Sequence, residues 1–148
     1  MAKLFHYIDL EKTTVAILKD YLDQEWKLQN DPKRLVEIDS DMRSPNSAFY
    51  GLPVQGGATS GEDRLCTALD KKSLISYGYQ QAKEYLREFT PAWERLSAEE
   101  RSLLRARYID SLEPKAIERI MREHHVSKSE AYNRLNKALS RLTKLLFW

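Results

Sequence analysis

The sequence has little cysteine, glycine, proline or histidine and no long uncharged hydrophobic run. Its 148 residues include one cysteine, five glycines, five prolines and three histidines. A single cysteine, Cys66, cannot form an internal disulfide, which fits a reducing compartment. No stretch approaches the roughly 18 uncharged apolar residues that a membrane helix needs, and the N-terminus turns polar at Asp9 before a signal-peptide core develops. We therefore expect a cytoplasmic protein without a membrane partner.

Positive charge is concentrated near the end of a nearly neutral chain. The whole sequence has a formal net charge of +2 at pH 7. From Pro114 to the C-terminus, eight basic residues face three acidic residues, so this segment carries +5 and residues 1–113 carry −3. Such a block indicates either a polyanion-binding surface or a solvated helix surface, and charge alone does not decide between them.

Helical spacing of apolar residues predicts an all-α protein, because no strand-like alternation is present. A first helix is predicted from Asp9, its cap, to about Asn30. Asn30-Asp31-Pro32 should end it, since the residue before proline is pushed out of the helical region. A short helical piece from Lys33 to Ile38 follows. The apolar positions of the first helix are Val15, Leu18, Leu22, Trp26 and Leu28.

The middle of the chain predicts a loop followed by a second long helix. Ser40 to Gly61 is rich in proline and glycine, which is typical of a linker or a long ordered loop. The helix should run from near Ser60 to about Phe89, with Pro91 closing it. Its near-3.5-residue apolar repeat indicates either a face packed on the first helix or a coiled-coil seam. The repeat comprises Leu65, Leu69, Ile75, Tyr79, Ala82, Leu86 and Phe89.

The last third predicts three short-to-medium helices with clear start signals. Ser97-Ala98-Glu99-Glu100 is a capping box that opens a helix to about Ile109. Glu113-Pro114 starts a second helix, which ends near His124-His125. Ser127-Lys128-Ser129-Glu130 is another capping box, with Val126 placed to staple onto Ala131, and the last helix runs to the C-terminus. The layout is thus an N-terminal helical segment (1–39), a loop or linker (40–60), a connecting helix (61–90) and a C-terminal domain (91–148).

The junction at His125-Val126-Ser127 indicates DNA binding. Two helices joined by a turn of three to four residues form the helix-turn-helix arrangement, in which the N-terminal residues of the second helix meet base edges in the major groove. The last helix has an apolar face formed by Ala131, Leu135, Ala138, Leu142 and Leu145. Its opposite face is small, polar or basic, with Ser129, Asn133, Asn136, Lys137, Ser140 and Lys144. An ordinary amphipathic helix with a solvated face is the alternative.

We assign candidate DNA contacts by side-chain chemistry. Asn pairs with adenine through two hydrogen bonds, and Lys and Arg supply salt-dependent phosphate contacts. The residues predicted to read or flank base edges are Lys128, Ser129, Tyr132, Asn133 and Asn136. The residues predicted to contact phosphate are Lys115, Arg119, Arg122, Arg134 and Lys137.

The same region resembles known transcription proteins. The run from Leu96 to Asp110, LSAEERSLLRARYID, resembles the start of region four of bacterial sigma factors, and the run VSKSEAYNRLNKAL from Val126 to Leu139 resembles its recognition helix. Tyr132 and the Lys-Ala-Leu ending are more similar to the ArpU/RinA-like regulators of phages and prophages. That resemblance implies control of late-gene transcription in a bacterial host through promoter DNA, with host RNA polymerase as a further expected contact. His125 departs from the glycine usual in this turn.

Two other functions are compatible with parts of the same sequence. A small-terminase-like packaging component would use the Leu65–Phe89 repeat for oligomerisation, and a sigma-like module would bind polymerase without touching DNA. A homodimer through the N-terminal helices stays open. We expect no enzyme, no cofactor and no metal site: His124 and His125 point about 100° apart on a helix and no cysteine cluster accompanies them, and no base can be paired with Cys66 from spacing.

Overall fold

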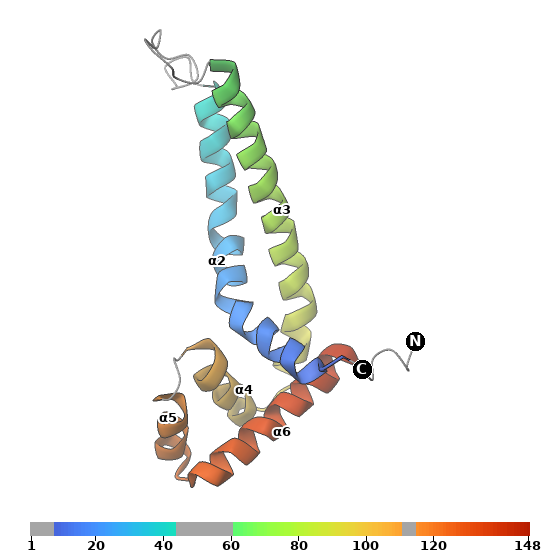
Figure 1. Cartoon of the computed structure of the whole chain (residues 1–148), viewed down its shortest axis with the longest axis vertical. Coiled ribbons are helices and arrows are strands. Elements are labelled where there is room, and N and C mark those ends of the chain that lie inside the picture. The colour runs from blue at the N-terminus through green and yellow to red at the C-terminus, as the bar shows by residue number, and fades with distance from the viewer. Residues whose placement is uncertain (1–7, 44–60, 111–114) are drawn as a thin grey trace. The chain divides into compact units, whose positions relative to one another are not determined.

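The computed structural model describes residues 8–43, 61–110 and 115–148, and every regular element in these ranges is helical. The predicted all-α class is therefore confirmed for the described part of the chain (Figure 1). In chain order the elements are α2 (Leu10–Arg43), α3 (Gly61–Glu94), α4 (Ala98–Leu104), the π-helical turn η1 (Arg105–Ile109), α5 (Lys115–His124) and α6 (Lys128–Phe147).

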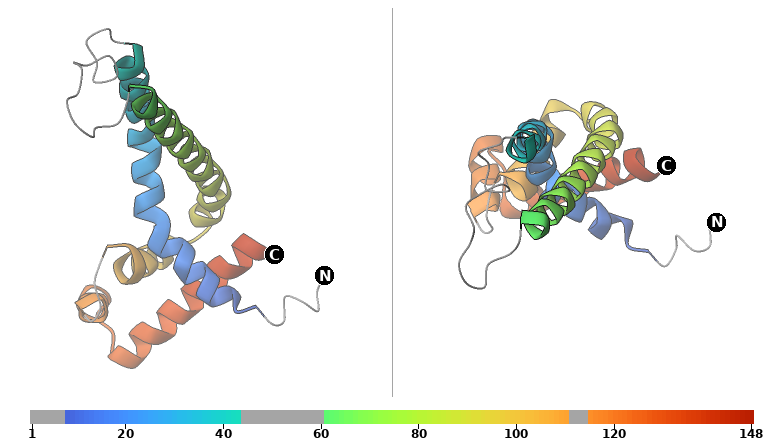
Figure 2. Two further views of the ribbon diagram at one scale, coloured as in Figure 1. Left: turned by 45° about the horizontal axis from the view of Figure 1, so that its top comes forward. Right: turned by 90° about the horizontal axis from the view of Figure 1, so that it is seen from above.

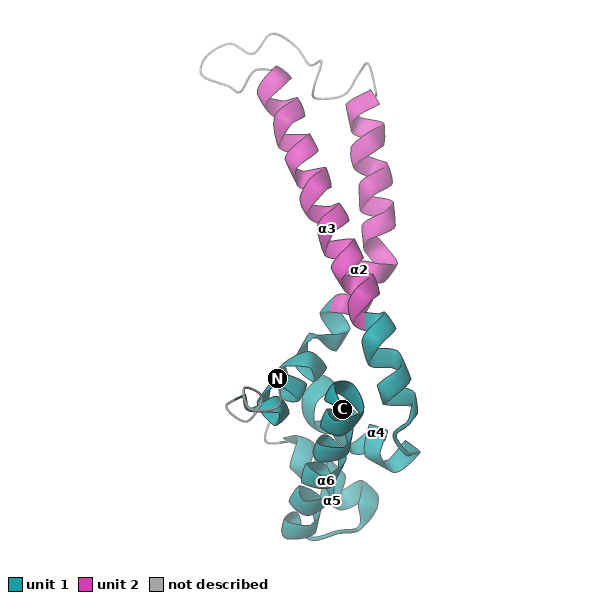
Figure 3. Cartoon of the chain, turned by 90° about the vertical axis from the view of Figure 1, so that its right-hand side faces the viewer, with its two compact units in different colours: residues 1–23, 86–148 teal, residues 24–85 magenta. Residues whose placement is uncertain are grey.

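The chain divides into two compact units, which Figure 3 colours separately. The larger unit contains residues 1–23 and 86–148, so it combines the start of α2 and the end of α3 with α4, η1, α5 and α6. The second unit contains residues 24–85 and is called the hairpin unit below, because its described part consists of one segment of α2 and one of α3.

The predicted end of the first helix at Pro32 was wrong. α2 continues through Pro32 to Arg43 and absorbs the expected Lys33–Ile38 piece. A proline inside a helix loses one backbone hydrogen bond and costs about 3 kcal/mol, so local signals alone would stop the helix here. Asn30 and Asp31 instead use their side chains within the helix: the Asn30 amide donates to the Trp26 carbonyl at 2.9 Å, and Asp31 accepts from Arg34 at 2.9 Å. Of the predicted loop, Ser40 to Arg43 are helical, and residues 44–60 lie outside the described residues.

The start of α2 agrees with its predicted cap, and its buried face agrees with the predicted one only in part. The Lys12 amide donates to the Asp9 carboxylate at 3.1 Å. Leu18 is fully buried, whereas Leu22 and Trp26 are 45% and 51% exposed. Of the apolar and aromatic positions between Leu18 and Pro32, only Tyr21 and Leu28 are half-buried; both lie on a seven-residue spacing with Thr14, and Leu28 was among the predicted positions. A 3.5-residue repeat drifts away from the 3.6-residue spacing used to choose Leu22 and Trp26, and this drift explains the error.

The predicted end of the second long helix at Pro91 was also wrong. α3 runs through Pro91 to Glu94. Phe89 and Ala92 are 2% and 5% exposed, and the rings of Phe89 and Trp93 stack with centroids 5.4 Å apart. This packing in the larger unit stabilises the helix on both sides of the proline, which sequence propensity cannot show. The predicted start at Ser60 lies outside the described residues.

In the hairpin unit, α2 and α3 are joined by an ion pair between Lys72 Nζ and Asp39 Oδ1 at 2.6 Å. Ile75 is buried, as the repeat in α3 predicted, while Leu65 and Leu69 are exposed. Asp31 is only 2% exposed and is paired with Arg34. A buried carboxylate needs such a partner, because an unpaired charge is costly to remove from water.

In the larger unit, the start of α2 lies against the C-terminal half of α6 (Figure 2). The hydroxyls of Thr14 and Thr143 meet at 2.8 Å, and both residues are buried. The Tyr21 ring lies 5.4 Å from that of Phe89, centroid to centroid, so the end of α3 contacts α2 here too. The core of this unit therefore depends on residues from both ends of the chain.

Candidate nucleic-acid interface

The continuous α4–η1 helix, α5 and α6 of the larger unit share one small hydrophobic core. Ser97 opens α4 with the predicted capping box, since both reciprocal hydrogen bonds between Ser97 and Glu100 are present. The π-helical turn η1 extends this helix to Ile109, the predicted end, and the Asp110 amide bonds back to the Arg105 carbonyl at 2.8 Å. The shared core comprises Leu103, Ala106, Ile117, Ile120, Ala131 and Leu135, from α4, η1, α5 and α6. This core fixes α5 and the first half of α6 against α4.

The turn between α5 and α6 contains three residues, and His125 adopts the left-handed conformation with φ 52°. The Val126 amide donates to the Met121 carbonyl at 3.1 Å, and both side chains pack on the shared core. A left-handed residue followed by this long hydrogen bond and an apolar contact is the Schellman helix ending. His125 thus occupies the left-handed position at which glycine was expected, at a conformational cost of about 1–2 kcal/mol.

The start of α6 is fixed by Ser127, as predicted. The Glu130 amide donates to Ser127 Oγ at 3.2 Å, and the Ala131 amide donates to the Ser127 carbonyl at 2.9 Å. The Glu130 carboxylate, expected to complete a capping box, instead accepts from Arg134 Nε at 3.0 Å. Val126 packs on the core cluster that contains Ala131, in line with the predicted staple.

The two predicted faces of α6 are seen in the burial of its side chains. Ala131, Leu135, Ala138 and Leu142 are at most 2% exposed, and Leu145 is half-buried. All five predicted base-reading or flanking residues are exposed: Lys128, Ser129, Tyr132, Asn133 and Asn136. Lys137 and Lys144 are exposed beside them, and Ser140 is half-buried. The five side chains predicted to read or flank base edges therefore share one solvent-facing side of a capped helix.

Electrostatics on this exposed side favour a polyanion. Glu130 is the only acid in α6, and Arg134 pairs with it. Within residues 8–43, 61–110 and 115–148, no ion pair engages five cations of α5 and α6: Lys115, Arg122, Lys128, Lys137 and Lys144. These lysines and arginine are free to exchange water and counterions for phosphate oxygens.

Two of the five predicted phosphate contacts are held by carboxylates. Arg119 Nε lies 2.9 Å from Glu123 Oε1 in a pair one helical turn apart. The hydrogen bond from Arg119 holds the pKa of the Glu123 carboxyl below its ordinary value, against the opposing effect of desolvation. Arg134 has two carboxylate partners. Lys115, Arg122 and Lys137 thus remain the predicted phosphate contacts whose charge is available.

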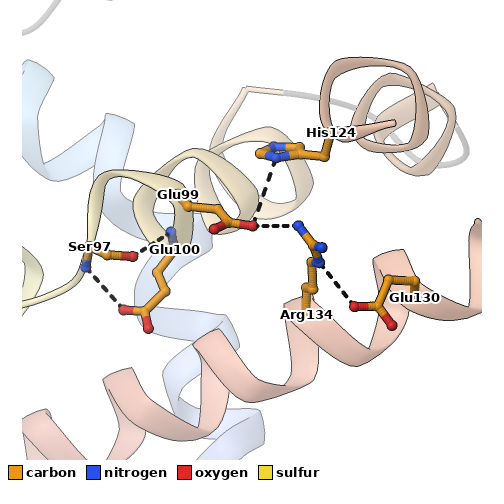
Figure 4. A network of polar contacts seen from close by, with 6 residues as sticks. All are labelled: Ser97, Glu99, Glu100, His124, Glu130 and Arg134. Carbon is orange, nitrogen blue, oxygen red and sulfur yellow. Dashed lines mark hydrogen bonds and ion pairs between the residues drawn. The ribbon is translucent and has the colours of Figure 1, made fainter. Parts of the chain in front are cut away.

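A polar network joins three helices through Glu99 of α4, which contacts both His124 of α5 and Arg134 of α6 (Figure 4). Arg134 Nη1 lies 2.7 Å from Glu99 Oε1 at the start of α4, and Arg134 Nε lies 3.0 Å from Glu130 Oε1. The His124 imidazole Nδ1, at the end of α5, lies 4.0 Å from the same Glu99 oxygen. The hydrogen bonds to Glu130 and Glu99 raise the pKa of the Arg134 guanidinium.

A second ion pair ties the same acidic turn of α4 to α6. Arg141 Nη1 lies 2.9 Å from Glu100 Oε1, and its Nη2 donates to the Arg95 carbonyl at 3.3 Å. Sequence reasoning assigned Glu99 and Glu100 to capping alone and missed both pairs. The signal was present, because Arg134 and Arg141 are seven residues apart and therefore lie on one face of α6.

The described residues form neither a metal site nor a disulfide. Within the described residues, no group of three or more His, Cys, Asp or Glu side chains is arranged to hold a metal ion. Cys66 is exposed and forms no disulfide. None of the described helices combines the length and the apolar character needed to cross a membrane.

No protein-family model, no curated protein and no solved structure matches this chain.

Proposed function

We propose that this protein is a sequence-specific, double-stranded DNA-binding transcription regulator. In this proposal α5, the turn at His125 and α6 act as a helix-turn-helix, with α6 in the major groove. The observation that carries the proposal is the exposed side of α6, where two asparagines and three lysines lie beside a single acid that is already paired. Asparagines are poor helix formers, and adenine recognition gives both of them a reason to be there.

The proposed role of each residue follows from its side-chain chemistry and from whether a carboxylate is paired with it. Ser129, Asn133 and Asn136 read base edges, and Lys128 and Tyr132 flank them at the start of α6. Lys115, Arg122 and Lys137 contact phosphate, because no ion pair among the described residues engages them. Arg119 contributes less than these three, since Glu123 holds it.

The biological setting is proposed from the sequence resemblance to sigma region four and to ArpU/RinA-like regulators. The protein would bind promoter DNA of late genes in a phage or prophage and act in the bacterial cytoplasm, with host RNA polymerase as a second partner. A dimer would suit a palindromic operator, because the two-fold symmetry of a protein matches that of its half-sites.

Selection from a random pool of duplex DNA tests the proposal. The full chain is incubated with the pool at about 150 mM salt and with excess nonspecific competitor. Recovery of one motif supports a sequence-specific regulator, and a repeat of that motif about 10 base pairs away supports a dimer. Recovery of no motif by folded protein would contradict the proposal.

Matched charge reversals separate DNA binding from the polymerase-binding alternative. Lys137→Glu places an acid on the exposed side of α6, while Lys19→Glu makes the same change on the exposed surface of α2. DNA binding should be lost with Lys137→Glu and kept with Lys19→Glu. Polymerase binding that survives both substitutions would favour the polymerase-binding module. A ring of many subunits in light scattering would favour the packaging component.

A further inference from the structure

Two consecutive acids in the first turn of α4 each hold an arginine of α6. Glu99 binds Arg134 at 2.7 Å, and Glu100 binds Arg141 at 2.9 and 3.1 Å. The two arginines are seven residues, or about 10.5 Å, apart along α6. Two attachment points at this separation define a direction, so the pairs bias the tilt of α6 relative to α4, which the shared core already holds close.

The charge around Arg134 is unsuited to phosphate binding. One guanidinium faces two carboxylates, Glu99 and Glu130, so the three groups together carry −1. A phosphate approaching Arg134 would have to displace a carboxylate and would meet the repulsion of both. Arg119 has a single acidic partner by comparison. Arg134 is therefore the least available of the predicted phosphate contacts.

The location of Arg134 suits a different role. It directly follows Asn133 and precedes Asn136, both exposed toward the proposed DNA side. Base recognition by paired hydrogen bonds depends on where these amides point, and a small rotation of α6 moves both together. Surface ion pairs contribute only about 0.2–1 kcal/mol each, which is too little to hold the fold but enough to bias the orientation of one helix.

We propose that Glu99 and Arg134 form a positioning pair that orients α6 for base reading, and that Arg134 does not contact phosphate. This inference rests on the proposed function, since it assigns a part of the base-reading geometry. Arg134 and Glu99 act through the side chains of Asn133 and Asn136 rather than on DNA.

The test compares Glu99→Gln and Arg134→Ala with a matched control. Glu118→Gln is the control for Glu99→Gln, because it removes the same charge. Glu118 is an exposed acid of α5 without an ion pair in the described residues. The Kd is measured for the selected motif and for unrelated DNA across a range of salt concentrations. Circular dichroism establishes that each variant is folded.

We expect both variants of the pair to reduce the ratio of specific to nonspecific affinity by about three- to fivefold. Their salt dependence should stay at the wild-type slope, and Glu118→Gln should leave the ratio unchanged. If Arg134 contacts phosphate, Arg134→Ala instead weakens both DNAs and reduces the slope by about one, while Glu99→Gln tightens both. That pattern overturns the inference, and so does an unchanged ratio in both folded variants.

Failure of the proposed function is distinguishable from failure of the pair. If wild-type protein selects no motif, the proposed function fails, and orientation is then measured directly by residual dipolar couplings of the α4 and α6 amides. Glu99→Gln should change the angle between the two helices, whereas Glu118→Gln should not. If Glu99→Gln leaves the angle between α4 and α6 at its wild-type value, as Glu118→Gln should, the positioning role is overturned.

Discussion

The hydroxyl of Thr14 meets that of Thr143 at 2.8 Å inside the larger unit, although 129 positions separate them in the chain. Each hydroxyl also lies within hydrogen-bond distance of its own helix, Thr14 with the Leu10 carbonyl at 2.9 Å and Thr143 with the Leu139 carbonyl at 2.8 Å. Two hydroxyl protons are thus available for three contacts. The start of α2 and the end of α6 are joined by a polar contact that is buried and shared.

Replacing one of these threonines should lower the free energy of unfolding only moderately, because the remaining hydroxyl still has a hydrogen-bond partner in its own helix. In Thr14→Val, Thr143 keeps the Leu139 carbonyl as its acceptor, so we expect a loss of about 1 kcal/mol in the free energy of unfolding. The Thr14→Val/Thr143→Val double variant should lose less than the sum of the single variants, because the pair shares one bond. Urea unfolding of the four proteins measures this, and strict additivity would mean that the two hydroxyls do not interact.

The α2 segment of the larger unit should contribute to its stability through Leu18. This side chain is fully buried, so Leu18→Ala should cost about 2–5 kcal/mol. Leu22→Ala makes the same substitution one turn later at a position 45% exposed, and it should cost about 1 kcal/mol or less. Equal losses in chemical unfolding would contradict the burial pattern of α2.

A glycine at the turn between α5 and α6 should stabilise the protein. His125 is left-handed, and glycine adopts this conformation without steric penalty. His125→Gly should therefore raise the free energy of unfolding by about 0.5–1 kcal/mol. His125→Ala keeps the steric penalty and should give no such gain. A stabilising alanine together with a neutral glycine would show that the imidazole, rather than the backbone, determines stability here.

Base reading and phosphate contact should respond differently to substitution in α6. Asn133→Ala should relax base preference at one position of the selected motif, at a cost of about 1–3 kcal/mol in discrimination. Lys137→Ala should weaken binding to all sequences and reduce the salt slope by about one. Competition binding with single-base variants of the motif measures both effects. The reverse assignment would mean that another side of α6 faces the groove.

The Arg119–Glu123 pair should have an acid-dependent effect on stability. The pKa of Glu123 is lower in the folded protein than its ordinary value, chiefly through the hydrogen bond from Arg119. The pair therefore stabilises the fold above the ordinary pKa of glutamate, and this contribution is lost as the pH falls through the lowered pKa.

Carboxyl NMR titration measures that effect. Arg119→Gln should raise the pKa of Glu123 toward its ordinary value. Arg122→Gln removes the same charge from a residue that acts on Glu123 by coulombic attraction without a hydrogen bond, so its effect on the pKa of Glu123 should be smaller. A larger shift from Arg122→Gln would contradict the geometry of the pair.

Local signals in the sequence predicted the parts of the fold that depend on neighbouring residues. The cap at Asp9, the capping box at Ser97 and the cap at Ser127 each require side chains within four positions, and all three are present. The exposed and buried sides of α6 follow from its periodicity in the same way. The five residues predicted to read or flank base edges are all exposed on α6, and their contact with DNA stays a prediction.

Interactions between distant residues account for what the sequence did not predict. Pro32 and Pro91 are strong local stop signals, and both lie inside helices that continue. The engagement of Arg134 by Glu99 joins positions 35 apart, so its charge appeared available in the sequence. Thr14 was not recognised as a core residue because its partner, Thr143, comes from the other end of the chain.

The π-helical turn at Arg105–Ile109 has a consequence for comparing this protein with others. A π turn holds one residue more than a regular α turn, as the bond from the Asp110 amide to the Arg105 carbonyl shows. A protein with the same three-helix core and a regular helix at this point would have one residue fewer between Ser97 and Asp110. An alignment between the two chains must therefore open a one-residue gap inside a helix, where gaps are usually penalised most heavily.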